Sequence, residues 1–341
     1  MGLRRTQSTP LDGVDAVFAD LDGVVYAGAG AIAHAVDSLN RVQTEMPVGY
    51  ITNNASRSDV SVAAHLRELG LTVEPHDVVT SPQAAMSLLA ELVEPGALIL
   101  VVGGDGIVTQ LEQRGYRMTR SAADNPDAVI QGFAPEVGWQ QLAEASFALN
   151  AHGGPGVPGG IPWVATNMDW TIPVARGIAP GNGTLVSAVH TAVGRLPVVA
   201  GKPEVAIFDE AKRRVGASAP LMIGDRLDTD ILGACRAGWK SVHVLTGIDK
   251  AKQLLAAPKG SRPDYIIGDL RELHEPYPRV ETARNGAFAV GKARVRIDGI
   301  TVVIESDGSS ELDLLRAACA AIWSNSLSIH ALTVPESLYE R

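Results

Sequence analysis

The sequence has few cysteines, no excess of positive charge and no long hydrophobic run, and each shortage excludes a class of protein. Cys235 and Cys319 are its two cysteines, so a disulfide framework is excluded and we expect a reducing, cytoplasmic location. The 29 Lys and Arg residues are outnumbered by 38 Asp and Glu residues, which argues against a protein that coats nucleic acid or anionic lipid. Apolar runs such as residues 97–102 are far shorter than the roughly 20 residues that span a bilayer. No apolar segment follows Arg4 and Arg5, so we expect neither a membrane anchor nor a secretory signal.

Enough apolar sequence is present for a folded protein of more than one domain. The chain has 341 residues, of which 46% are hydrophobic and 20% charged, as in soluble globular proteins. Short apolar runs alternate with helical patterns, which is typical of parallel βαβ construction. Helices are predicted at 32–42, 60–69 and 205–215, and strands at 14–19, 48–51, 196–200 and 221–223.

Each of these four predicted strands ends next to a polar residue, namely Asp20, Thr52, Lys202 and Asp225. Ligands of open α/β sheets bind outside the carboxyl ends of parallel strands, so we expect these four residues to converge at one rim. Thr52 offers a hydroxyl to a phosphoryl oxygen, with Asn53 beside it as a turn residue, and Lys202 supplies a positive charge. A single Thr or Lys at a strand end usually lies on the solvent-exposed surface, but four strand ends that all carry such polar residues indicate a ligand-binding site.

Asp20 and Asp22 stand two residues apart, so in an extended chain both carboxylates point to the same side. One could attack phosphorus as a nucleophile, and the other could act as an acid and then as a base. Gly23 permits the close backbone approach that a phosphate site made of main-chain N–H groups requires. Taken alone, this motif is equally compatible with a simple turn after a strand.

A second acidic cluster lies at residues 224–230. Mg²⁺ prefers oxygen ligands, and Asp20 and Asp225 would supply carboxylates while Asp230 orients the site from outside the ligand set. Asp228 fits better as an acidic residue that interacts favourably with a helix N-terminus.

These motifs, in this order, resemble the four motifs of the haloacid dehalogenase (HAD) superfamily of phosphatases, over roughly residues 11 to 280. The resemblance implies that Asp20 is the nucleophile and Asp22 the general acid and base. It further implies that Mg²⁺ is held by Asp20, by Asp225 and by the main-chain carbonyl of Asp22, and that Asp230 lies outside this set of ligands. Phosphate would be bound by Gly23, Thr52, Asn53 and Lys202.

The same resemblance predicts the fold and the domains. We expect an α/β protein with a Rossmann-like parallel-sheet core at 11–82 and 195–280. An α/β cap is inserted at 83–194, like the large (type C2) cap of the 4-nitrophenylphosphatase branch, with similar segments at 165–169 and 180–185. Cap strands are predicted at 97–102, 128–130 and 163–165, and a cap helix at 137–149.

A small α+β extension follows at 281–341, with a hairpin that turns at Asp298–Gly299 and a helix over 312–322. The extension resembles the acetyltransferase-like fragment of some bacterial members of this branch. It lacks the glycine-rich loop that would bind the pyrophosphate of coenzyme A. We therefore expect it to be non-catalytic, and packing on the core, formation of a homodimer and regulation remain its alternatives.

The expected function is that of a Mg²⁺-dependent phosphomonoesterase that acts through an aspartyl phosphate on a small phosphorylated metabolite. Pyridoxal-phosphate phosphatases of this branch carry a His shortly after the cap Asp, where this chain has Ile172. We therefore favour a small aliphatic phosphate, glycerol 3-phosphate or a phosphoglycolate-like compound. Asn167, Asp169 and Ile172, in the predicted cap loop at 167–172, would select the leaving group. Residues of this loop could equally be packing residues. The alternatives are a nucleotide, sugar-phosphate or pyridoxal-phosphate phosphatase and, in another class, a receiver-like regulatory protein.

Overall fold

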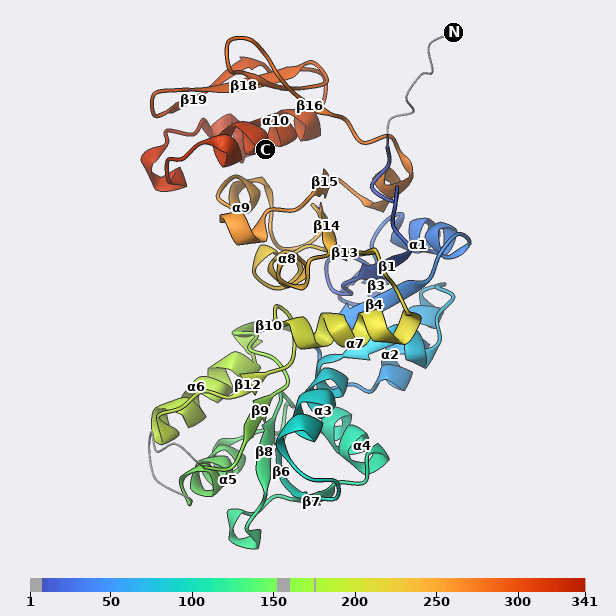
Figure 1. Ribbon diagram of the computed structural model, residues 1–341, viewed down its shortest axis with the longest axis vertical. Coiled ribbons are helices and arrows are strands. Elements are labelled where there is room, and N and C mark those ends of the chain that lie inside the picture. The colour runs from blue at the N-terminus through green and yellow to red at the C-terminus, as the bar shows by residue number, and fades with distance from the viewer. Residues whose placement is uncertain (1–7, 152–159, 175, 341) are drawn as a thin grey trace. The chain divides into compact units, whose positions relative to one another are not determined.

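The computed structural model describes residues 8–151, 160–174 and 176–340 of the chain (Figure 1). It divides into a first unit, residues 1–48 and 218–341, and a second unit, residues 49–217. Across the described residues, no helix combines the length and the apolar character needed to cross a membrane.

The first unit contains a parallel sheet with strand order β15-β14-β13-β1. Every residue of β1 and β13 is buried, as expected for parallel strands that are covered on both faces. Its elements before the extension are β1 (Ala16–Ala19), β2 (Tyr26–Ala27), β3 (Gly30–Ala31), α1 (Ala35–Gln43), β13 (Pro220–Gly224), a π-helical turn (Leu227–Ile231), α8 (Leu232–Ala237), β14 (Lys240–Val244), α9 (Ala251–Leu255) and β15 (Tyr265–Ile267).

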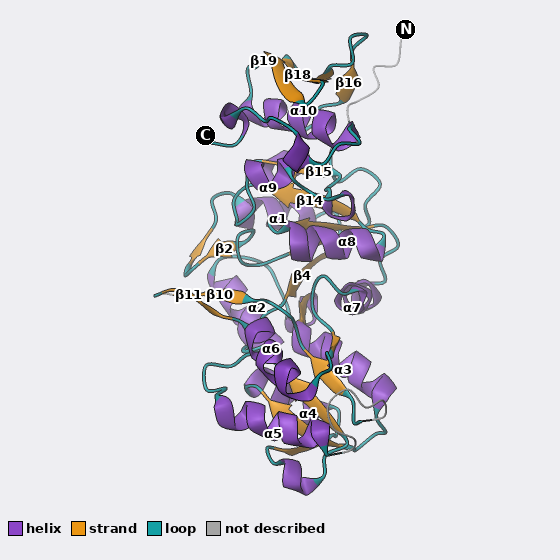
Figure 2. Ribbon diagram, turned by 90° about the vertical axis from the view of Figure 1, so that its left-hand side faces the viewer, coloured by secondary structure: helices purple, strands orange, loops and turns teal. Residues whose placement is uncertain are grey.

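The C-terminal part of the first unit is a four-stranded antiparallel sheet with one long helix packed on it (Figure 2). Its elements are β16 (Val280–Thr282), β17 (Phe288–Val290), β18 (Ala293–Asp298), β19 (Thr301–Ser306) and α10 (Glu311–Ser324). The apolar face of α10 shares one buried cluster with Leu227, Ile231, Leu254 and Ile266. The extension therefore has no separate core, since its hydrophobic residues are buried together with those of the parallel-sheet region.

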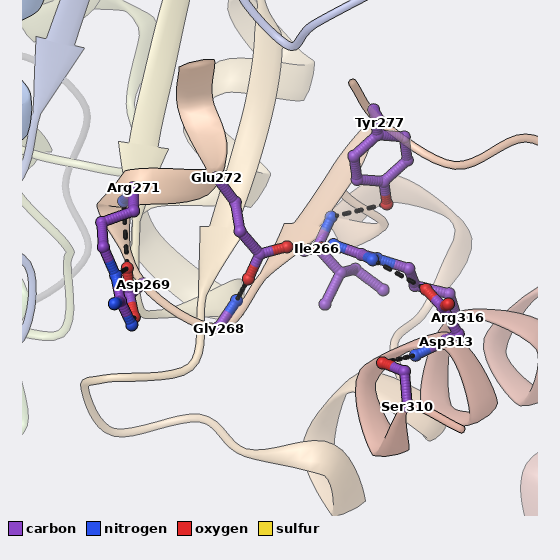
Figure 3. A network of polar contacts seen from close by, with 9 residues as sticks. All are labelled: Ile266, Gly268, Asp269, Arg271, Glu272, Tyr277, Ser310, Asp313 and Arg316. Carbon is purple, nitrogen blue, oxygen red and sulfur yellow. Dashed lines mark hydrogen bonds and ion pairs between the residues drawn. The ribbon is translucent and has the colours of Figure 1, made fainter. Parts of the chain in front are cut away.

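Arg316 fastens α10 to β15, the last strand of the parallel sheet (Figure 3). Its guanidinium donates to the main-chain oxygen of Ile266 through Nε at 2.9 Å and Nη2 at 2.7 Å. It also pairs with Glu272 at 2.7 Å and Asp313 at 3.0 Å, and it lies 4.6 Å from the ring centre of Tyr277. The N–H of Ile266 donates to the Tyr277 hydroxyl at 3.0 Å. Side chains thus satisfy both backbone groups of Ile266 on a strand that would otherwise present an open edge.

The second unit contains a parallel pair, β4 with β5, and a five-stranded sheet of order β12-β9-β8-β6-β7. In the larger sheet, alternate residues such as Leu100 and Val102 face α5 and α6, while α3 and α4 cover the opposite face (Figure 1). The elements are β4 (Val48–Thr52), α2 (Asp59–Glu68), β5 (Val78–Thr80), α3 (Ser81–Leu92), β6 (Leu98–Val102), α4 (Asp105–Gln113), β7 (Arg117–Thr119), β8 (Ala128–Gln131), α5 (Trp139–Asn150), β9 (Trp163–Ala165), β10 (Thr171–Val174), β11 (Gly177–Pro180), α6 (Asn182–Val193), β12 (Val198–Val199) and α7 (Val205–Val215).

The predicted α/β class with parallel sheets is confirmed, and α7 has the predicted bounds. The expectation that 196–200 forms a strand of the sheet that contains β1 and β13 is wrong. Only Val198–Val199 is extended, and it pairs with β9 as an edge of the five-stranded sheet. A short apolar run shows that a strand forms but not which strand it pairs with.

The predicted hairpin turn at Asp298–Gly299 is also wrong by one residue. Asp298 still pairs with Thr301, so the two turn residues are Gly299 and Ile300. The φ angle of Gly299 is +60°, in the left-handed region that glycine enters without the steric cost of a Cβ. The backbone preference of Gly299 therefore places it first in the turn, and Ile300 follows it exposed to solvent.

Candidate active site

Three buried carboxylates meet at the carboxyl ends of two adjacent strands in the first unit. Asp20 follows β1 directly and Asp225 follows β13, and these two strands pair in parallel. Asp230 lies in the π-helical turn after Asp225. One carboxylate oxygen from each of the three residues lies within 4.8 Å of those of the other two. Because β1 and β13 are neighbours, their ends bring together residues that are 205 positions apart in the chain.

The turn that follows Asp20 depends on Gly23. The N–H of Gly23 donates to the carbonyl of Tyr26 at 2.9 Å, and its φ of +83° lies in the left-handed region. A Cβ at this position would overlap the carboxyl group of Asp225, so glycine is required for both conformation and space. Asp22 is exposed in this turn. The strand ends at Ala19, so Asp20 and Asp22 are related by a turn and not by the regular strand geometry expected.

In the second unit, Asn53 connects three segments that are far apart in the chain. Its side-chain amide donates to Asp169 Oδ1 at 2.9 Å and to the main-chain oxygen of Lys202 at 3.0 Å. Its Oδ1 accepts the N–H of Lys202 at 2.8 Å. Thr52 and Lys202 are both buried, and the Lys202 ammonium donates to the carbonyl of Ile51 at 3.1 Å. Asn53 thus holds the Lys202 segment beside the end of β4.

The loop that contains Asn167 and Asp169 is fixed by the same asparagine. Asn167 donates to the carbonyl of Asn53 at 2.7 Å and accepts the N–H of Asp169 at 3.1 Å. Asn167 is fully buried, whereas Ile172 is half-buried in β10 and Trp170 is 60% exposed. Of the predicted specificity residues, Asn167 and Asp169 therefore hold the loop in place, while Ile172 lies on the hairpin that extends from it.

Comparison with known proteins identifies the family. Residues 17–117 match a family model described as haloacid dehalogenase-like hydrolase, and residues 199–273 match one described as HAD-hydrolase-like. The D-glycerol 3-phosphate phosphatase of Mycobacterium tuberculosis is 42% identical over 317 residues, which cover 91% of this chain and 86% of that protein. The chain belongs to the haloacid dehalogenase-like hydrolases.

Solved structures and a second relative place this HAD hydrolase among phosphatases. The acid sugar phosphatase of Staphylococcus aureus is 33% identical over 74% of this chain and 94% of its own length. The crystal structure of a glycerol phosphate phosphatase from M. tuberculosis in complex with magnesium superposes with a TM-score of 0.84, at 38% identity over 96% of this chain and 95% of that one. NagD from Escherichia coli has a TM-score of 0.66 and 26% identity, over 75% and 97% of the two chains. Residues 291–335 match a model described as a GCN5-related N-acetyltransferase like domain.

This HAD hydrolase is a phosphomonoesterase that uses Mg²⁺. The predicted HAD family, the phosphatase class and the cofactor are thereby confirmed, and the receiver-like alternative is excluded. The first unit offers a donor set that suits this ion, because Asp20 and Asp225 present hard oxygen ligands at close range, with Asp230 beside them, and all three carboxylates are buried. A divalent cation there would offset the mutual repulsion of the three carboxylates.

Thr246, Asp249 and His243 are neighbours of this acidic cluster that sequence reasoning missed. Thr246 donates to the carbonyl of Gly23 at 2.6 Å, and Asp249 donates its N–H to the main-chain oxygen of Asp225 at 3.1 Å. Thr246 and Asp249 follow β14. Ligand-site residues tend to follow parallel strands, so an interpretation of residues 241–244 as such a strand would have identified both.

His243 is fully buried in β14, and burial lowers its pKa to about 4. Its Nε2 lies 3.0 Å from the carbonyl of Asp249 and so carries the proton, while Nδ1 has no hydrogen-bond partner among the described residues. The unfolded chain, with a pKa near 6.5, binds more protons between these two values, so folding stability falls as the pH drops through this window. No such contribution is expected above pH 7.

We therefore expect His243→Gln to remove part of the acid sensitivity of the protein. Between pH 7.5 and 4.5, wild type should lose about 2 to 3 kcal/mol more unfolding free energy than the variant. Urea denaturation at both pH values measures the difference. His330→Gln, at an exposed position, is the control and should keep the pH dependence of the wild type, whereas equal slopes for wild type and His243→Gln would contradict the prediction.

Proposed function

We propose that this phosphatase hydrolyses a small aliphatic phosphate monoester, glycerol 3-phosphate, through an aspartyl phosphate on Asp20. The observation that carries the proposal is the buried cluster of Asp20, Asp225 and Asp230 at the ends of β1 and β13. The choice of substrate is supported by Ile172 at the place of the histidine of pyridoxal-phosphate phosphatases and by the 42% identity to a D-glycerol 3-phosphate phosphatase.

In the proposed reaction, a carboxylate oxygen of Asp20 attacks phosphorus and the bond from phosphorus to the ester oxygen breaks. Asp22 donates a proton to the departing alkoxide and then takes a proton from the water that hydrolyses the acyl phosphate. Bound Mg²⁺, held by Asp20, Asp225 and the main-chain carbonyl of Asp22, supplies positive charge to the phosphoryl oxygens. The exposure of Asp22 beside the buried Asp20 suits these two roles, because one group exchanges protons and the other is shielded from water.

Thr52, Lys202 and the main-chain N–H of Asn53 are proposed to bind phosphoryl oxygens, and Gly23, whose own N–H donates to Tyr26, is proposed to allow the close approach of the backbone to phosphate. The Asn53 side chain already forms hydrogen bonds with Lys202 and Asp169. We therefore propose that Asn53 binds phosphate through its main-chain N–H and not through its side chain. Asp230 is proposed to orient the site, since its Oδ2 accepts the N–H of Arg226 at 3.1 Å. Ile172 is the proposed contact to the leaving group.

The domain limits, the location and the assembly also remain proposals. We propose a HAD core at 11–82 and 195–280, a cap at 83–194 and a non-catalytic extension at 281–341. The two cysteines support a cytoplasmic location. A homodimer is proposed as the assembly.

A panel of phosphate esters tests the proposed substrate. We expect kcat/KM for glycerol 3-phosphate to exceed the values for pyridoxal phosphate, a hexose phosphate and a nucleoside monophosphate by about tenfold or more, since discrimination lies in that ratio. Phosphoglycolate is included as the nearest competitor. In EDTA, activity towards every ester should disappear and return with added Mg²⁺. A higher kcat/KM for any other ester would overturn the assignment of substrate without affecting the mechanism.

A further inference from the structure

The segment Thr246–Asp249, between β14 and α9, surrounds Asp225 with hydrogen bonds. The N–H of Ile248 donates to Asp225 Oδ2 at 2.7 Å, and the N–H of Asp249 donates to the main-chain oxygen of Asp225 at 3.1 Å. Asp225 is therefore held at its carboxylate by Ile248 and at its main-chain oxygen by Asp249, two consecutive residues of one short segment.

The same segment also holds Gly23 and Leu227, which belong to the two stretches that carry the acidic cluster. The Thr246 hydroxyl donates to the carbonyl of Gly23 at 2.6 Å. The carboxylate of Asp249 accepts the N–H of Leu227 at 2.7 Å, at the start of the turn that carries Asp230. Thr246–Asp249 thus contacts both stretches, at Gly23 after β1 and at Asp225 and Leu227 after β13.

Close packing leaves no room for a side chain at Gly247, in the centre of the segment. A Cβ on Gly247 would overlap the carboxyl group of Asp225, and a Cβ on Gly23 would lie 2.9 Å from the Cα of Gly247. Both ends of the segment are anchored in the hydrophobic cluster of the C-terminal extension, through Leu245 and Ala251. His243 adds a third anchor, because its Nε2 donates to the carbonyl of Asp249 at 3.0 Å.

We propose that Thr246–Asp249 is a positioning element that holds Asp225 and Gly23 in register with Asp20, so that Thr246 and Asp249 set the affinity of the site for its divalent cation. The inference rests on the proposed function, because it takes Asp225 as a metal ligand. Neither Thr246 nor Asp249 is assigned any contact with substrate. Partners that orient metal ligands typically contribute 10- to 100-fold to metal affinity.

The test measures Mg²⁺ and Mn²⁺ binding to the purified full chain by titration calorimetry, without substrate. Asp249→Ala and Thr246→Val are expected to raise the dissociation constant by about tenfold or more, while kcat at saturating Mg²⁺ changes little. Asp249→Asn and Thr246→Ser retain an acceptor and a hydroxyl, respectively, and should restore most of the affinity. A merely structural role would not produce a shift in metal affinity that the conservative variants reverse.

Asp269→Ala is the matched control. Asp269 also accepts a main-chain N–H, that of Arg271 at 3.0 Å, but it makes this contact at the turn after β15 (Figure 3). Its removal should leave the dissociation constant within about threefold of wild type. An equal loss in Asp269→Ala would show a general effect of removing carboxylates and would overturn the inference.

The outcomes separate the inference from the proposed function. If wild type binds no divalent cation, or if Asp225→Asn binds it as wild type does, the metal site itself is misassigned and the inference falls with it. If Asp225→Asn loses binding while Asp249→Ala and Thr246→Val keep it within threefold, only the inference is overturned. Circular dichroism checks folding, and if Asp249→Ala does not fold, Thr246→Val decides.

Discussion

Replacing Asp20 by asparagine is expected to lower kcat by on the order of 1,000-fold or more, with little change in the fold. The amide is not a nucleophile towards phosphorus, so the covalent route is closed. The substitution also removes one of the three carboxylates that lie within 4.8 Å of one another, so the site loses negative charge for the cation. Steady-state turnover of 4-nitrophenyl phosphate and of glycerol 3-phosphate measures the loss.

The matched control is Asp228→Asn, in the acidic stretch that also contains Asp230. Asp228 is exposed and pairs with Arg226 at 2.8 Å, and exposed ion pairs contribute little to stability. Its kcat should remain within about twofold of wild type. A kcat for Asp20→Asn within tenfold of wild type, in a variant with an unchanged circular dichroism spectrum, would exclude Asp20 as the nucleophile.

Replacing Arg316 by alanine is expected to destabilise the first unit by about 3 kcal/mol. Arg316 is 6% exposed, and its loss leaves the carboxylate of Glu272 and the carbonyl of Ile266 without their strongest donor (Figure 3). It also removes the cation stacked on Tyr277. Chemical denaturation measures the change in unfolding free energy, and α10 should become more sensitive to proteolysis.

Arg296→Ala is the comparison within the same extension. Arg296 forms ion pairs with Asp298 at 3.0 Å and Glu305 at 2.9 Å, but these groups are partly or largely exposed. Its loss should cost less than about 1 kcal/mol. If the two arginine variants had equal stability, Arg316 would not be the attachment of α10 that its contacts indicate.

Local patterns in the sequence were sufficient to predict several helices, several parallel strands and the acidic cluster, but not β5, β14 or β15. Polar residues that directly follow apolar runs can be located without any tertiary information, because a strand and its end are adjacent in the chain. Asp20 and Asp225 were found in this way, and the structure places their carboxylates together. The role of Asn53 as a junction could not be predicted in this way, because its partners Asp169 and Lys202 lie 116 and 149 residues away.

The sequence by itself determined the α/β class, the four ordered motifs and the choice of a Mg²⁺-dependent phosphatase of the HAD family. Only the tertiary structure decided that Val198–Val199 joins β9, that Thr246–Asp249 encloses Asp225 and that Arg316 attaches α10 to β15. The physical reason is that backbone propensity and side-chain chemistry act between neighbours in the chain. Strand pairing and buried hydrogen bonds depend on which distant segments the packed core brings together.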